Sequence, residues 1–209
     1  DLYISEDNLY KNNEYSVSSI TDYDLVSTAL CNVDTNKIAY CIWEESQLKD
    51  DVSIDELNSI LDDLLYNKDI SISTIKSSSE EVSYPIADYQ INNIGIVLSD
   101  NGLKLIGPCD GGYGFIKYTD KKIIKAEKND DYLFVYENQA FGEDYMEDDN
   151  DRFLTFYYKD YDRTVVLEKG LIRDADNPTP NWDLYNTYKY TFKNIDGDYF
   201  FESLELVNE

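Results

Sequence analysis

The sequence predicts an α+β fold in which N-terminal helices pack on a long, curved and mostly antiparallel sheet. Helical periodicity is confined to the first third of the chain. Alternating apolar and polar residues, separated by turn residues, fill most of the remainder. Helices followed by strands favour a segregated α+β fold over an alternating α/β fold.

The helical part, residues 20–67, contains two amphipathic segments. Thr21 is suited to N-cap a first helix that extends to about Cys31. Ser53 and Glu56 have the spacing of a capping box ahead of a second helix. The apolar residues of both segments recur at helical spacing: Leu25, Ala29 and Leu30 in the first, and Leu57, Ile60, Leu61, Leu64 and Leu65 in the second.

The antiparallel part, residues 69–207, reads as a meander of short strands. Tight turns are expected where the residues favour positive φ or a chain reversal: Asn101-Gly102, Asp120-Lys121, 129–131 and Asp196-Gly197. One strand or buried segment is expected between the helices, at 37–43. The strands of the meander are expected at about 69–75, 88–98, 103–106, 113–119, 122–128, 131–138, 152–159, 163–168, 187–194 and 198–207.

A single domain is expected over residues 20–209, because no linker rich in Pro, Gly or Ser divides the chain. Residues 1–19 are polar with scattered Leu and Tyr, which predicts a tether or an edge strand. A helical layer on the concave side of the sheet corresponds to an NTF2-like or cystatin-like fold. A lipocalin-like β-barrel with a helical cap is the alternative, because the short strands are numerous.

The charge balance excludes several classes of partner. The chain has 43 acidic and 18 basic residues, a net charge of −25, so its field repels phosphate backbones and anionic headgroups. We therefore expect no nucleic acid and no direct binding to anionic membranes. Histidine is absent, which excludes Ser-His-Asp and Cys-His nucleophiles and His-ligated metal centres.

Three cysteines, Cys31, Cys41 and Cys109, allow at most one intrachain disulfide. Cys31 and Cys41 could be bridged, and three reduced thiols are the equal alternative. Cys109 lies in a Gly-rich run, 107–114, that lacks the Gly-Lys-Ser/Thr of a phosphate-binding loop. A wide turn between strands is the expected role of that run.

The acidic segment 143–151 is the best candidate for a metal site. Carboxylate oxygens are the ligands that calcium prefers, although the spacing here does not match an EF-hand. The candidate ligands are Asp144, Glu147, Asp148, Asp149 and Asp151, and a second, equally weak group lies at 174–177. A solvated acidic loop is the alternative. No cofactor other than calcium is expected.

Aromatic residues supply the candidate ligand site. Twenty tyrosines could form a sugar-binding surface, because an aromatic face stacks well and its hydroxyl can form a hydrogen bond. Most of them are expected to cover a half-buried sheet instead. Trp182, near the end of the proline-containing insertion 173–183, and its neighbours Tyr185 and Tyr188 are the stacking candidates for a glycan.

Two segments resemble known proteins. They are GGYGFIKYTDKKIIKAEKNDDYLFVYENQAF (111–141) and YKYTFKNIDGDYFFESLELV (188–207). Together they resemble uncharacterised secreted or membrane-anchored, lipoprotein-like proteins of low-GC Gram-positive bacteria. The resemblance implies an extracellular or membrane-anchored location and no particular activity.

The expected function is that of a non-catalytic extracellular surface domain that binds a protein, peptide or glycan. The absence of histidine and of nucleophile motifs favours this hypothesis over catalysis. A carboxylate-dependent glycan hydrolase is one alternative, since two carboxylates suffice for glycoside hydrolysis. A structural module of a larger surface assembly is the other.

Overall fold

The computed structural model describes residues 14–42, 44–82, 86–91, 93–107, 116–146, 153–172 and 180–207. These residues form two compact units, and each unit is described by itself. Unit 1 contains the described residues of 17–107, and unit 2 contains 14–16 and the described residues of 116–207. The single domain expected over residues 20–209 stays a prediction.

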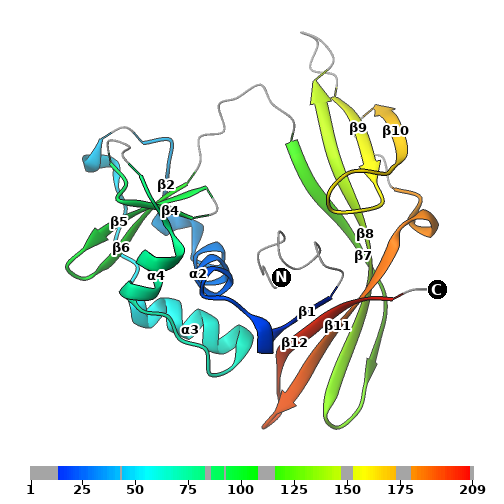
Figure 1. Cartoon of the computed structure of the whole chain (residues 1–209), viewed down its shortest axis with the longest axis horizontal. Helices are drawn as coiled ribbons and strands as arrows, with labels where there is room; N and C mark the ends of the chain where they lie inside the picture. The colour runs from blue at the N-terminus through cyan, green and yellow to red at the C-terminus, as the bar shows by residue number, and fades with distance from the viewer. Residues whose placement is uncertain are drawn as a thin grey trace. The chain divides into compact units, whose positions relative to one another are not determined.

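The α+β class is confirmed, because three α-helices are followed by a large, curled antiparallel sheet of half-barrel form in the described residues (Figure 1). The helices are α2 (Asp22–Cys31), α3 (Ile54–Leu65) and α4 (Ile72–Ser78). The strands of unit 1 are β2 (Ile38–Tyr40), β3 (Glu80–Glu81), β4 (Tyr89–Ile91), β5 (Ile94–Ser99) and β6 (Gly102–Gly107). Those of unit 2 are β1 (Glu14–Ser16), β7 (Ile116–Lys128), β8 (Tyr132–Met146), β9 (Phe153–Tyr158), β10 (Val166–Ile172), β11 (Asn186–Ile195) and β12 (Asp198–Val207).

Helices α2 and α3 begin where the capping residues predict. Thr21 and Asp24 form a reciprocal capping box at the start of α2. The Ser53 hydroxyl accepts from the backbone N–H of Glu56, but the Glu56 carboxylate pairs with Lys37 at 2.6 Å and does not close a box. No helix in the described ranges is long and apolar enough to cross a membrane.

The strand predicted at 69–75 is wrong, since α4 occupies most of it. The side-chain hydroxyls of Ser71 and Thr74 each accept a hydrogen bond from the other residue's backbone N–H. These bonds satisfy donors at the start of the helix, which in a strand would need partners from another strand. Ile75 is fully buried and anchors the short helix. Alternation of Ile with small hydroxyl residues therefore imitated a strand pattern.

Unit 1 carries a five-stranded mixed sheet in the order β2-β6-β5-β4-β3, with β2 parallel to β6 and the other pairs antiparallel. The strand predicted at 88–98 is two strands, β4 and β5. The β5–β6 hairpin loop is Asp100-Asn101, one residue before the predicted pair, because Ser99 lies opposite Gly102. Gly102 has a φ of +154° and begins β6.

Unit 2 is built around a seven-stranded antiparallel sheet in the order β1-β12-β11-β8-β9-β10, with β7 also paired to β8. The turn predicted at Asp120-Lys121 is wrong, because β7 runs unbroken opposite β8 and contains a register shift between Ile123 and Lys125 instead. The hairpin predicted at Asp196-Gly197 is confirmed, with both residues at positive φ.

We predict that Gly102→Ala destabilises unit 1 by about 3 kcal/mol, as measured by urea denaturation. An alanine Cβ would overlap the backbone oxygen of Val52 and strain the positive φ. It would also disturb the Val52–Leu103 bridge, whose hydrogen bonds measure 2.7 and 2.9 Å.

Gly95→Ala is the matched control in the same sheet. Its Cβ would lie 3.3 Å from the Cβ atoms of Ala87 and Ile106, which can adjust, so a loss of about 1 kcal/mol is expected. Equal losses in the two variants would contradict the explanation.

Candidate functional site

Strand β8 changes partner along one of its edges. Its other edge pairs with β7 over almost the whole length of the strand. On the changing edge, residues 132–139 pair with β11 and residues 141–146 pair with β9. The change occurs at Ala140, which is fully buried, so the end of β9 and the start of β11 separate at this point. We call this place the fork.

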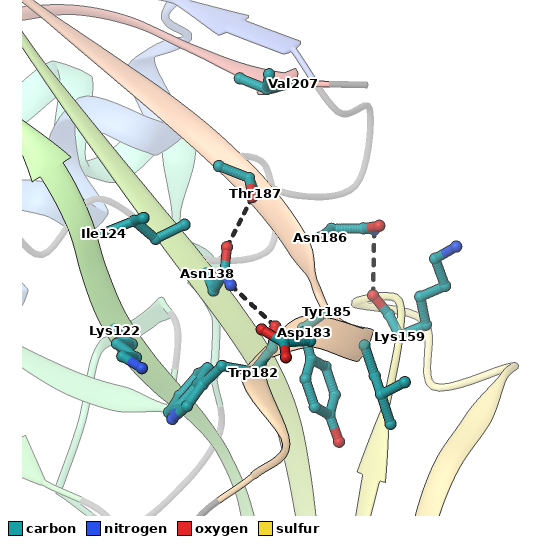
Figure 2. A pocket seen from close by; sticks show the side chains of 11 residues that line it. Lys122, Ile124, Asn138, Lys159, Trp182, Asp183, Tyr185, Asn186, Thr187 and Val207 are labelled. Atoms are coloured by element: carbon teal, nitrogen blue, oxygen red, sulfur yellow. Dashed lines mark hydrogen bonds between the residues drawn. The ribbon is translucent and has the colours of Figure 1, made fainter. Parts of the chain in front are cut away.

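An open cleft of about 650 Å³ lies beside the fork, within unit 2 (Figure 2). Its wall combines aromatic, amide, hydroxyl and charged side chains. The strands contribute Lys122 and Ile124 of β7, Asn138 of β8, Asn186 and Thr187 of β11, and Val207 of β12. The remaining lining residues are Lys159, which follows β9, the three residues of the 3₁₀-helix η4 (Trp182–Leu184), and Tyr185, which precedes β11.

Asn138 holds the chain segment that carries Trp182. Its amide nitrogen Nδ2 donates to the backbone oxygen of Trp182 at 2.9 Å, and its Oδ1 accepts from the Thr187 hydroxyl at 2.7 Å (Figure 2). Across the fork, Asn186 Nδ2 donates to the backbone oxygen of Lys159 at 3.3 Å. Side-chain amides therefore donate hydrogen bonds to backbone oxygens at the place where strand pairing stops.

Aromatic rings fill the interior of the fork. Tyr157 and Tyr185 are buried with Ala140, and their rings meet edge to face with centroids 6.2 Å apart. The partly buried indole of Trp182 packs on the same cluster, 6.3 Å from the Tyr185 ring. This packing fixes the indole at the cleft wall, because edge-to-face contacts restrict the orientation of both rings.

Two carboxylates bind the tyrosine hydroxyls of this cluster. The Tyr185 hydroxyl donates to Glu168 Oε2 at 2.5 Å, and the Tyr157 hydroxyl donates to Asp120 Oδ2 at 2.6 Å. The backbone N–H of Asn181 also donates to Glu168 at 3.0 Å. Burial and the hydrogen bond to Glu168 raise the pKa of Tyr185, because both disfavour the phenolate.

The three predicted stacking residues differ in their position relative to the cleft. Trp182 and Tyr185 both line the cleft, but Tyr185 is only 7% exposed and supports the wall from behind. Tyr188 is 1% exposed and does not line the cleft, because it lies opposite Glu137 and alternates to the other face from Thr187. Trp182 is therefore the aromatic residue best placed to meet a ligand.

Of the predicted calcium ligands, only Asp144 lies in the described residues. It is 1% exposed and accepts a hydrogen bond from the Thr155 hydroxyl at 2.7 Å. Glu147, Asp148, Asp149 and Asp151 lie outside the described residues, as do 174–177 and Cys109. In the described residues no group of three metal-ligating side chains is present, and Cys31 and Cys41 are not bridged.

Sequence reasoning did not identify Lys122, Asn138, Lys159 and Thr187 as members of one site. Lys122, Asn138 and Thr187 are brought together by strand register: Lys122 lies opposite Asn138, which in turn lies opposite Thr187. Alternation indicates which residues of one strand share a face, but not which residue of a distant strand lies opposite.

We predict that Asn138→Asp destabilises unit 2 by about 1–3 kcal/mol. A carboxylate can still accept from Thr187, but it cannot donate to the backbone oxygen of Trp182. Urea denaturation and the fluorescence of Trp182 in a Trp43→Phe background measure the effect. Unchanged stability and emission would show that Asn138 does not hold this segment.

We predict that Tyr185→Phe costs about 1–2 kcal/mol of stability at pH 7, because Glu168 loses its hydroxyl donor. The folded state favours the protonated hydroxyl of Tyr185, whose pKa is raised. This stabilisation is complete below pH 10.0, the ordinary tyrosine value, and declines as the pH rises above it. The difference between wild type and variant in urea denaturation should therefore shrink from pH 10 upward.

Tyr136→Phe is the control, because the Tyr136 hydroxyl also donates to a glutamate, Glu127 at 3.1 Å, but at an exposed position. Its loss at pH 7 should be below about 0.5 kcal/mol. If the two variants lose the same stability, burial of the Tyr185–Glu168 pair is not the cause.

Comparisons with protein-family models, curated proteins and solved structures found no match to this chain.

Proposed function

We propose that this chain is a non-catalytic extracellular binding domain, and that it binds a glycan in the cleft beside the fork. The observation that carries the proposal is the partly buried Trp182, which forms a wall of the cleft and is fixed there by Tyr185 and Asn138. An indole fixed before binding loses little rotational freedom when a ligand stacks on it.

The composition of the cleft fits a sugar better than an apolar molecule. A pyranose has an apolar C–H face, which suits an aromatic ring, and a rim of hydroxyl groups, which suits amides and charges. Trp182 supplies the ring, and Asp183 supplies an exposed carboxylate for the rim. Extended peptides usually bind along a strand edge or groove, whereas this cleft lies on the face of four paired strands, beside η4.

The extracellular location is part of the proposal and is supported by the resemblance of residues 111–141 and 188–207 to secreted or lipoprotein-like proteins. We further propose an NTF2-like or cystatin-like arrangement, with a lipocalin-like barrel as the alternative. The curled sheet of unit 2 and the helices that precede it along the chain support this assignment.

The test is a titration of neutral and acidic oligosaccharides against protein carrying Trp43→Phe, so that emission reports Trp182 alone. We expect a saturable change with at least one sugar, and a loss of affinity of about tenfold or more in Trp182→Ala, measured by calorimetry.

Tyr40→Ala is the matched control, since Tyr40 is an exposed aromatic residue of unit 1, outside the cleft, and its variant should bind as wild type. A panel without any binding would refute the proposal. Binding that survives Trp182→Ala would place the ligand elsewhere.

A further inference from the structure

The hydrogen bonds at the cleft leave an uneven set of polar groups for a ligand. Asn138, Asn186 and Thr187 already bind the backbone or one another. The hydroxyl of Tyr185 is bound to Glu168. Neutral groups that often contact sugar hydroxyls are thus engaged in holding the fork together.

The charged groups of the cleft and the indole N–H of Trp182, in contrast, are not engaged by other described residues. Neither the ammonium groups of Lys122 and Lys159 nor the indole N–H of Trp182 has an acceptor in the part of the chain that the structure describes. Asp183 is exposed and contributes the one carboxylate among the described lining residues. Available donors therefore exceed available acceptors at this site.

Two nearby lysines of the same sheet, Lys125 and Lys189, are engaged by carboxylates, whereas the exposed Lys193 has no carboxylate partner among the residues that the structure describes. Lys125 pairs with Glu127 at 3.1 Å and lies 4.1 Å above the Tyr136 ring. Its hydrogen bond lowers the pKa of Glu127. Lys189 pairs with Glu205 at 2.6 Å. The two cleft lysines thus stay available to a ligand, although carboxylates are abundant in a chain of net charge −25.

We propose that the cleft binds an acidic saccharide, a sugar whose ring carries a carboxylate. Lys122 and Lys159 lie on opposite sides of Trp182 and Tyr185 (Figure 2), so each binds the carboxylate of a different ring of an oligosaccharide. Trp182 stacks on the C–H face of a ring, and Asp183 accepts hydrogen bonds from ring hydroxyls. A neutral sugar would offer the two ammonium groups only hydroxyl oxygens, whereas a carboxylate accepts stronger, charge-assisted hydrogen bonds. The inference rests on the proposed glycan-binding function and names its substrate class.

The charge of the whole protein adds selectivity. The negative field of the protein opposes the approach of any anion. A long polyanion is repelled along its full length, while only two lysines of the cleft attract it. A short saccharide with one or a few carboxylates places its charge at the lysines and little elsewhere. Added salt screens the long-range repulsion more than the close contacts.

The experiment compares a tetrasaccharide of galacturonic acid with its carboxyl-reduced counterpart, in which each carboxylate is a hydroxymethyl group. Calorimetry with wild-type protein should give an affinity for the acidic form about five- to tenfold higher than for the reduced form. Lys122→Gln and Lys159→Gln should each weaken binding of the acidic form about two- to threefold, and the double variant should abolish the preference.

Lys193→Gln is the control variant, because Lys193 is an exposed lysine of β11 outside the cleft lining and its loss removes the same charge. Equal wild-type affinity for both sugars, with binding that depends on Trp182, would overturn the acidic preference and leave the glycan-binding function intact. Failure of both sugars and of the neutral panel would refute the function itself. A preference equally reduced by Lys193→Gln would reflect net charge and overturn the assignment to the cleft.

Discussion

The architecture of unit 2 depends on the pairing of one strand, β8, with three others. A strand has two edges, and β8 uses one for β7 and divides the other between β11 and β9. Where the division falls, the backbone groups of two strand ends lose their sheet partners and must be satisfied locally. The amides of Asn138 and Asn186 do this, and the aromatic cluster fills the space beneath. The cleft lies beside the point where β8 changes its partner from β11 to β9.

Local chemistry made part of the fold predictable. The caps at Thr21 and Ser53 and the turn at Asp196-Gly197 depend on neighbours a few residues away, and all three are observed. The errors arose where distant partners decided the outcome. Asp120 resembles a turn residue, yet its carboxylate accepts from Tyr157, and pairing with β8 keeps the chain extended.

The candidate site was predictable to a smaller extent. Trp182 was a candidate because an aromatic side chain can stack on a sugar, which is a property of the residue itself. Its neighbours in the cleft come from β7, β8 and β12, and only the register of three strand pairs places them together. Tyr185 and Tyr188 were indistinguishable in sequence, and their different burial follows from the face on which each side chain falls.

Ala140 lies at the fork, where its small side chain is fully buried in a cluster with Tyr157 and Tyr185, and Trp182 packs against this cluster. A residue at this position meets no ligand, yet its volume determines how closely the strands on either side converge. Natural variation or design could therefore change the shape of the cleft by altering one residue behind its wall, with the lining residues unchanged. The shape of a surface cleft can in this way evolve from within the core of the unit.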